Sequence, residues 1–307
     1  ASSGLIFFSS KGFQSIGRLC SVVDEVTCLP EGVLAMEAQF KRMQIDCMLH
    51  VFYDKQAAEA AFRARIPLRV GRINRLGQWR YCNRLLFLSQ RWDRTCHEAS
   101  IAIGYMKAFN QSIDYSSDLK AHRLIASKLA SLPDDIDAEC AQHELNIILH
   151  PGSQGNGAEW PQSHFIELIE RLSDVHAHFW ITGVSHEVAR FKPLLEAAAR
   201  LNHVDAIMGA LNLDQLITLI SCSTIVVSSG TGPVHLAAGL GVHTVGLYPN
   251  HRTIGPDRWG PLGADVSVFQ PKRLSTERGM ISGLEVADLA QHIRNKLKEV
   301  SVIRGLK

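Results

Sequence analysis

The residues best suited to chemistry lie in a loop of small side chains, Ser228-Ser-Gly-Thr-Gly-Pro-Val-His235. An apolar run precedes the loop, and an apolar helical pattern begins near Pro233. Small residues let a ligand approach the backbone, and the free N–H groups of a helix N-terminus bind anions such as phosphate. The pattern predicts a phosphate-binding turn to which Thr231 can add a hydroxyl donor. An ordinary strand-to-helix turn is the alternative.

A second loop of this kind is His150-Pro-Gly-Ser-Gln-Gly-Asn-Gly157. It also follows an apolar run and precedes a helical pattern, and its glycines permit a turn lined by N–H groups. It lacks the Gly-Lys-Ser/Thr of a Walker A loop and the Gly-x-Gly-x-x-Gly of a dinucleotide fingerprint, so both of those classes lose support.

The elements that must position these loops alternate between strand and helix. In the second half, strands are predicted at 145–150, 178–182, 204–208, 225–227 and 244–248, with amphipathic helices between them. In the first half, strands are predicted at 5–8, 22–26 and 45–52, and helices near 33–43 and 54–65. Such alternation predicts an α/β fold with parallel sheets covered by helices.

Length and composition set the wider limits. The chain has 307 residues, a formal net charge of +2, 46% hydrophobic and 20% charged residues, which excludes a disordered chain. We expect two domains, 1–135 and 140–307, with a last helix at 283–299 that is a candidate to pack back on the N-terminal domain. No apolar run is long enough to span a bilayer, and residues 1–10 do not resemble a signal peptide. Seven cysteines without a Cys-x-x-Cys pair predict free thiols.

The order of several motifs resembles glycosyltransferase family 9, the ADP-heptose:lipopolysaccharide heptosyltransferase family. The motifs are His150-Pro-Gly-Ser153, Trp160-Pro161, Gly183-x-x-His-Glu187 and Thr231-Gly-Pro-x-His235, followed by Arg258-Trp-Gly-Pro-Leu-Gly263. The resemblance is strong from about 145 to 300 and weaker from the N-terminus to about 110.

This resemblance implies a GT-B fold, in which two Rossmann-like, doubly wound domains face each other across a cleft. The N-terminal domain would bind the acceptor, and the C-terminal domain would bind a nucleotide sugar without a metal ion. The family pattern implies that Ser153 and Gln154 touch the donor phosphates, that Glu187 binds the ribose and that Leu211 contacts the adenine. The pyrophosphate loop would comprise Gly230, Thr231, Gly232, Pro233 and His235.

Three positions depart from the family pattern. The basic residue that many members place two before Trp-Pro is Ala158 here, followed by Glu159, so a positive charge is missing unless Arg252 or another residue supplies it. The Asp that often precedes the second loop's Thr-Gly is Gly230. The Ser-x-Gly-Asp that carries the family's general base is not found.

Near the N-terminus, Ser9-Ser-Lys-Gly-Phe13 is superficially similar to that base motif, but Phe13 cannot accept a proton. We prefer an alignment in which residues 5–9 are the family's second strand, so that its first βα unit has no counterpart here. On either alignment no catalytic residue can be assigned.

A basic segment marks the first half. Between Arg63 and Arg94 there are nine arginines and a single acid, with aromatic residues interleaved. We interpret Arg72, Arg75, Arg80 and Arg84 as a patch for an anionic lipopolysaccharide acceptor or for the membrane surface. Nucleic acid is the rival partner, and the resemblance argues against it. Solvated helix faces are the third possibility.

The resemblance thus implies an inverting transfer of a heptose, or a related sugar, from a nucleotide sugar (ADP-heptose in the family) to a lipopolysaccharide core. The enzyme would be cytoplasmic and peripheral at the inner face of the bacterial inner membrane. Two alternatives stay open: a non-catalytic nucleotide-sugar or glycolipid-binding homologue, and a GT-B nucleotide-sugar 2-epimerase. No cofactor or metal is expected, although the close pair His176 and His178 leaves a weak surface metal site open.

Overall fold

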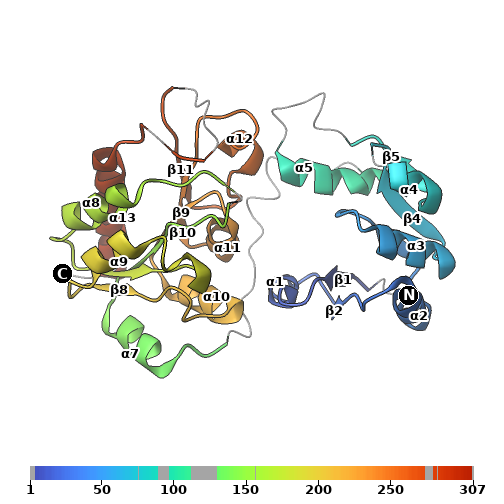
Figure 1. Cartoon of the computed structure of the whole chain (residues 1–307), viewed down its shortest axis with the longest axis horizontal. Helices are drawn as coiled ribbons and strands as arrows, with labels where there is room; N and C mark the ends of the chain where they lie inside the picture. The colour runs from blue at the N-terminus through green and yellow to red at the C-terminus, as the bar shows by residue number, and fades with distance from the viewer. Residues whose placement is uncertain are drawn as a thin grey trace. The chain divides into compact units, whose positions relative to one another are not determined.

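The structure is a computed structural model that describes residues 4–74, 76–88, 97–111, 130–155, 157–273, 279–281 and 283–305. The chain divides into two compact units, Ala1–Asp118 and Leu119–Lys307 (Figure 1). The domain boundary that we predicted between residues 135 and 140 falls within helix α7 (Asp134–Gln142). This helix belongs to the second unit.

A six-stranded parallel sheet forms the centre of the second unit, with the strand order β11-β10-β9-β6-β7-β8. Its strands are β6 (Asn146–His150), β7 (His178–Ile181), β8 (Val204–Ala206), β9 (Ile225–Ser229), β10 (His243–Leu247) and β11 (Val266–Phe269). Every residue of β6, β7, β9 and β10 is buried, as expected for strands covered on both faces. The α/β class predicted from the sequence is confirmed.

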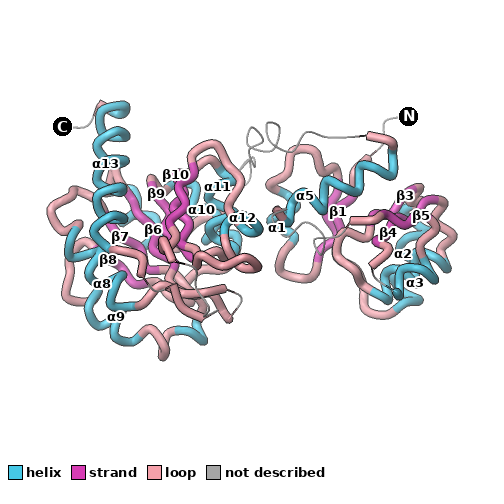
Figure 2. The backbone as a smooth tube through the Cα atoms, turned by 90° about the horizontal axis from the view of Figure 1, so that it is seen from above, coloured by secondary structure: helices cyan, strands magenta, loops and turns pink. Residues whose placement is uncertain are grey.

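Helices cover both faces of this sheet. One side is covered by α8 (Gln162–Arg171), α9 (Lys192–Ala198) and α13 (Val286–Arg304), and the other by α10 (Leu213–Cys222) and α11 (Gly232–Leu240) (Figure 2). Two short helical segments lie in the connections, η2 (Ser185–Glu187) and α12 (Pro256–Trp259). The last helix begins at Val286, three residues later than predicted, and its apolar face packs in this unit's core against α8.

The first unit also consists of parallel strands and helices. Its elements are β1 (Ile6–Ser9), α1 (Gln14–Arg18), β2 (Glu25–Cys28), α2 (Val33–Met43), β3 (Cys47–Leu49), α3 (Lys55–Arg63), β4 (Leu68–Arg72), α4 (Leu76–Tyr81), β5 (Arg84–Leu86), α5 (Glu98–Ile103) and η1 (Gly104–Phe109). The strands form two separate sheets, β1-β2 and β3-β4-β5.

The division of these strands bears on the N-terminal alignment. In a doubly wound domain the first strand is central and separates the second and third strands from the rest. The described strands divide into β1-β2 and β3-β4-β5, and the interpretation of residues 5–9 as the family's second strand stays a prediction. The strand predicted at 22–26 is shifted to β2, because the Asp24 carboxylate and backbone bind Leu5 in a turn before the strand begins.

None of the helices in the described parts of the chain is long and apolar enough to cross a membrane.

Candidate active site

Two loops meet at the place in the second sheet where the strand order reverses. From β6 the chain proceeds outward through β7 and β8, and from β9 it proceeds the other way through β10 and β11. Such a switch point is where open α/β sheets bind ligands. The loops after β6 and β9 flank it and nearly touch, since a Cβ on Gly157 would lie 3.7 Å from the carbonyl oxygen of Gly230.

The loop after β9 leads directly into helix α11. Thr231 is the N-cap residue in extended conformation, but its side chain does not cap the helix; its Oγ1 lies 3.2 Å from Ser228 Oγ and 3.3 Å from the carbonyl oxygen of Ser229. Gly232 is exposed, and a Cβ there would meet nothing within 4 Å. Pro233 is half-buried in the first helical turn and His235 is exposed. The backbone at the start of α11 is therefore accessible at Gly232, and its role in phosphate binding stays a prediction.

Gly230 is a glycine for a steric reason. A Cβ at this position would overlap the ring of Tyr248, which is almost fully buried after β10 and donates its hydroxyl to the carbonyl oxygen of Trp259 at 2.6 Å. The ring thus occupies the space into which an Asp side chain at 230 would project. This accounts for one of the three departures from the family pattern.

The loop after β6 is held by carboxylates of the protein itself. Ser153 donates its backbone N–H and its hydroxyl to Glu159 Oε1 at 2.7 and 2.8 Å, and Gln154 donates its N–H to Glu187 Oε1 at 3.2 Å. Gln154 and Gly155 adopt left-handed backbone conformations that make this turn. The backbone N–H groups of Ser153 and Gln154 therefore already donate to carboxylates of the protein. Any contact of these two residues with phosphate must come from their other atoms.

Glu187 lies beneath this loop. Its side chain is 3% exposed, Arg190 Nη2 donates to its Oε1 at 2.7 Å, and its buried Oε2 has no hydrogen-bond partner among the described residues. A Cβ on Gly152 would overlap this carboxylate, so a larger residue at 152 would have to displace the side chain of Glu187. The arrangement brings one unsatisfied carboxylate oxygen to the loop at the switch point.

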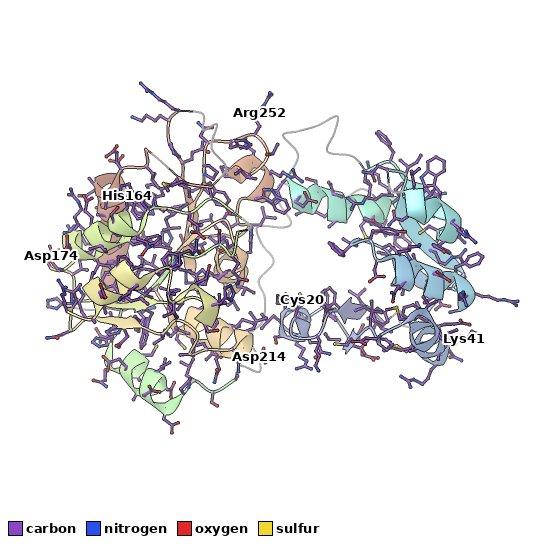
Figure 3. The ribbon with its side chains drawn as sticks, viewed as in Figure 1. Cys20, Lys41, His164, Asp174, Asp214 and Arg252 are labelled. Carbon is purple, nitrogen blue, oxygen red and sulfur yellow. The ribbon has the colours of Figure 1, made fainter. Side chains whose placement is uncertain are left out.

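Arg190 supplies a positive charge beside the loop. Its guanidinium makes two contacts with Glu159, one of them 2.9 Å from Nη2 to Oε1, and a third with Glu187. Burial alone would raise the pKa of Glu159, but the hydrogen bonds from Arg190 and Ser153 outweigh it and hold that pKa below its usual value. Sequence reasoning missed Arg190, although it lies three residues after Glu187. Ala158 is buried, and Arg252 is exposed in the loop before α12 (Figure 3).

His150 ends β6 directly before the loop, and sequence reasoning gave it no role. It is buried, and its Nδ1 lies 2.8 Å from Thr182 Oγ1. Burial lowers its pKa to about 4, against the opposing charges of Glu187 and Glu159, so the ring is neutral at pH 7. It therefore contributes a hydrogen bond below the loop and no charge.

Leu211 is half-buried just before helix α10. The spacing of Asn212 and Gln215, three residues apart, predicts a helix cap, and the structure confirms it: Asn212 Oδ1 accepts from Gln215 N at 3.0 Å, and Gln215 Oε1 accepts from Asn212 N at 3.1 Å. This capping box fixes the direction in which the chain carries Leu211 into the helix.

The arginines of the basic segment in the first unit differ in their exposure and in their hydrogen bonds. Arg80 and Arg84 are exposed, whereas Arg72 is half-buried and its Nε has no partner among the described residues. Arg69 serves the structure by donating to the carbonyl oxygens of Tyr81 and Ile66. Arg75, Arg91 and Arg94 lie outside the described residues. The exposed Leu76, Trp79 and Phe87 belong to the same segment.

The N-terminal loop offers no proton acceptor at the position we considered. Phe13 is 55% exposed and precedes α1. The Asp-x-Asp of the chain, Asp135-Ile-Asp137, lies in the first turn of α7 and is not part of either loop at the switch point.

Comparison with known proteins shows the family. Residues 57–280 match the family described as glycosyltransferase family 9 (heptosyltransferase). The lipopolysaccharide core heptosyltransferase OpsX of Haemophilus influenzae is 26% identical over 272 residues, which cover 82% of this chain and 73% of that protein.

Solved structures share the fold. ADP-heptose lps heptosyltransferase II of E. coli superimposes with a TM-score of 0.71 at 19% identity, covering 98% of this chain and 90% of that one. E. coli heptosyltransferase WaaC with ADP gives 0.69 at 18% identity, covering 95% and 90%.

Two α/β units built on parallel strands, with two loops at the switch point of the second, place the chain in the GT-B fold class. Within that class, the chain belongs to glycosyltransferase family 9, the heptosyltransferases.

Proposed function

We propose that this glycosyltransferase moves a heptose, or a closely related sugar, from ADP-heptose to a lipopolysaccharide core, with inversion at the anomeric carbon. The family match and the relative named as a lipopolysaccharide core heptosyltransferase support this donor and acceptor class. The observation that carries the proposal is the buried Glu187 with its unsatisfied oxygen beneath the loop at the switch point.

The diphosphate of the donor would bind at the start of α11. As the sugar leaves, negative charge builds up on the diphosphate, and the free N–H groups and dipole of a helix N-terminus stabilise it there. Thr231 can add its hydroxyl, and Gly232 leaves the backbone accessible. Pro233 presets the first turn, and the exposed His235 one turn along would border the sugar phosphate.

The nucleoside would be held by Glu187 and Leu211. Glu187 Oε2 can accept hydrogen bonds from the two ribose hydroxyls, which would satisfy a buried acceptor that has no partner among the described residues. Leu211 offers an apolar surface for the adenine. The exposed side chain of Gln154 would approach the phosphates from the opposite loop. Ser153 is buried and would reach them only if its hydroxyl exchanged Glu159 for phosphate.

Donor binding should not need a divalent metal. The N–H groups and the dipole at the start of α11 would stabilise the diphosphate without an ion. We expect ADP to bind equally in EDTA and in magnesium; binding that is lost in EDTA and restored by magnesium would contradict this part of the proposal.

The first unit would bind the acceptor. Its exposed Arg80 and Arg84 suit the phosphates of a lipopolysaccharide core and the anionic surface of a membrane. This fits a cytoplasmic enzyme that works peripherally at the inner face of the inner membrane. The base that deprotonates the acceptor hydroxyl is not assigned to any residue.

Glu187→Gln tests the proposal. Loss of a charged acceptor should weaken ADP binding by about 1–3 kcal/mol, or roughly 5–150-fold in Kd, measured by calorimetry. Because Glu187 also holds Gln154 and Arg190, the same titration is repeated with 2′,3′-dideoxy-ADP. If Glu187 binds the ribose, the variant and wild type should bind this analogue alike. An equal loss for both nucleotides would refute the assignment, and Glu196→Gln, an exposed carboxylate on α9, is the matched control.

A radiolabelled-sugar transfer assay with a heptose-deficient lipopolysaccharide core then separates a working enzyme from a binding homologue. Transfer of one sugar per acceptor supports the proposed reaction. Donor binding without turnover would favour the non-catalytic alternative, to which Ala158 and Gly230 lend support.

A further inference from the structure

A compact group of metal-ligating side chains lies on helix α7 and the start of β7. Glu139 lies on α7, His143 is the extended C-cap residue directly after that helix, and His178 is the first residue of β7. Glu139 Oε1 lies 2.9 Å from His143 Nε2 and 3.7 Å from His178 Nδ1, and the three potential ligand atoms all lie within 4.8 Å of one another.

His178 is the best argument that this group has a ligand. Its side chain is 1% exposed; Asp205 Oδ2 lies near its Nε2, whereas its Nδ1 makes no hydrogen bond to a described residue. Buried polar atoms are nearly always satisfied, so the unsatisfied Nδ1 calls for a partner. The ring lies between α7 on one side and Asp205 of β8 on the other.

Asp205 completes the arrangement expected around a metal-bound histidine. Its Oδ2 lies 3.0 Å from His178 Nε2, so a proton on Nε2 would leave a lone pair on Nδ1, which lies 3.7 Å from Glu139 Oε1. Metal-ligating histidines usually present their second nitrogen to a carboxylate in this way. The His143 ring stacks on the His178 ring with centroids 4.5 Å apart, so it would turn when both rings bind one ion. Burial, with the like charge of His143, lowers the pKa of His178 despite the two carboxylates, and so favours the neutral ring that a metal requires.

We propose that Glu139, His143 and His178 bind a divalent transition metal ion of the zinc type, with Asp205 orienting His178. Two nitrogens and one carboxylate oxygen are a common zinc ligand set, and water would fill the fourth position because Glu139 and His143 are one-third exposed. Bonds of about 2.0–2.2 Å in a tetrahedral site place ligand atoms about 3.3 Å apart, and the observed 2.9 and 3.7 Å lie on either side of that value.

The ion would be structural. The site is at the amino end of β7, whereas the candidate donor loops follow the carboxyl ends of β6 and β9, so it lies at the opposite edge of the sheet. A metal there would fasten α7 to the sheet. The sequence had pointed to His176 with His178, but His176 is exposed and precedes the strand, and the described group comprises Glu139, His143 and His178.

The test uses the full chain, stripped with EDTA and returned to buffer. Zinc is titrated by calorimetry, and cobalt by the visible absorption that reports four-coordinate nitrogen and oxygen ligands. We expect one ion per chain, a melting temperature raised by several degrees at saturating zinc, and unchanged ADP binding.

His143→Ala and Glu139→Gln should each weaken zinc at least about tenfold, and Asp205→Asn should weaken it about 10–100-fold while keeping the stoichiometry. The exposed His176→Ala is the matched control and should bind as the wild type does. Zinc binding that survives in His143→Ala and Glu139→Gln, or that is lost in His176→Ala, would overturn the proposal. Absence of stoichiometric binding by the wild type would overturn it as well.

Discussion

At the scale of single residues, the site rests on a few charged hydrogen bonds that sequence spacing alone does not reveal. Glu159 accepts three of them on Oε1, from the N–H and hydroxyl of Ser153 and from Arg190. The sequence presents Glu159 only as an acid standing near a missing basic residue. The structure instead makes it the residue that fixes the loop after β6.

We therefore predict that Glu159→Gln loosens this loop. A neutral amide cannot accept so many donors at full strength, and each charged hydrogen bond contributes about 1.5–3 kcal/mol. ADP binding should weaken by about tenfold or more, measured by calorimetry. Glu167→Gln, which removes an exposed carboxylate paired with Arg171 on α8, is the control and should leave binding unchanged. Equal affinity in both variants would show that the loop does not depend on Glu159.

The same carboxylate gives a pH dependence. Because the folded pKa of Glu159 lies below its ordinary value of 4.5, its stabilising effect is present above that value and is lost as the pH falls through the lowered pKa. The difference in unfolding free energy between the wild type and Glu159→Gln should therefore be full at pH 7 and shrink below about pH 4.5. Urea unfolding at pH 7, 5 and 3.5 measures it; a difference that grows toward low pH would contradict the assignment.

At the scale of elements, the strands and helices of the second unit follow their apolar periodicity, and most were predictable. The cap of α10 at Asn212 was visible as a spacing of three residues. What could not be predicted depends on contacts between distant segments. The ring of Tyr248 leaves no room for a side chain at residue 230. Asp24 binds Leu5, so β2 begins one residue after it. Such contacts arise only after the chain has folded.

This steric limit predicts that Gly230→Asp will not restore the family's usual residue. The new side chain must displace the buried Tyr248 ring, and overpacking of this kind costs about 1–3 kcal/mol. Thermal unfolding should show a melting temperature about 3–10 °C lower. Gly232→Ala, two residues on, has open space around its Cβ and should unfold close to the wild type. A Gly230→Asp variant as stable as Gly232→Ala would show that the ring moves without cost.

At the scale of the whole molecule, two neutral histidines make stability depend on pH. Burial lowers the pKa of both His50, in the first unit, and His150, in the second, to about 4. Between pH 6.5 and about 4, the unfolded chain binds protons that the folded chain does not, so stability must fall as the pH falls. Each histidine contributes a slope of up to about 1.4 kcal/mol per pH unit.

Urea unfolding between pH 7 and pH 5 checks this. His150→Gln should flatten the slope, because one titrating group is removed while a hydrogen-bonding side chain is kept beside Thr182. The exposed His186→Gln is the control and should leave the slope as it is in the wild type. If His150→Gln has the wild-type slope, His150 is not the group that titrates.

The exposed arginines of the first unit predict that the protein binds anionic membranes. Replacing Arg80 and Arg84 with Ser should weaken binding to vesicles that contain anionic lipid and flatten the salt dependence, because fewer ions are exchanged. Co-sedimentation at 50 and 200 mM salt measures both effects. Arg200→Ser with Lys298→Ser, which removes two exposed charges from the second unit, should change neither. A larger effect in the second pair would place the membrane-binding surface elsewhere.

The close approach of Gly152 to Glu187 has a consequence for how this family can diverge. The two positions share one volume, since any Cβ at 152 would occupy the space of the carboxylate at 187. A single mutation at 152 leaves an intermediate whose acid is displaced, and only a shorter acid at 187 would free the space again. We expect lineages to keep glycine and glutamate together or to exchange both. Gly152→Ala alone should therefore destabilise the fold, and Glu187→Asp should partly restore its stability. The two positions would then change together in evolution.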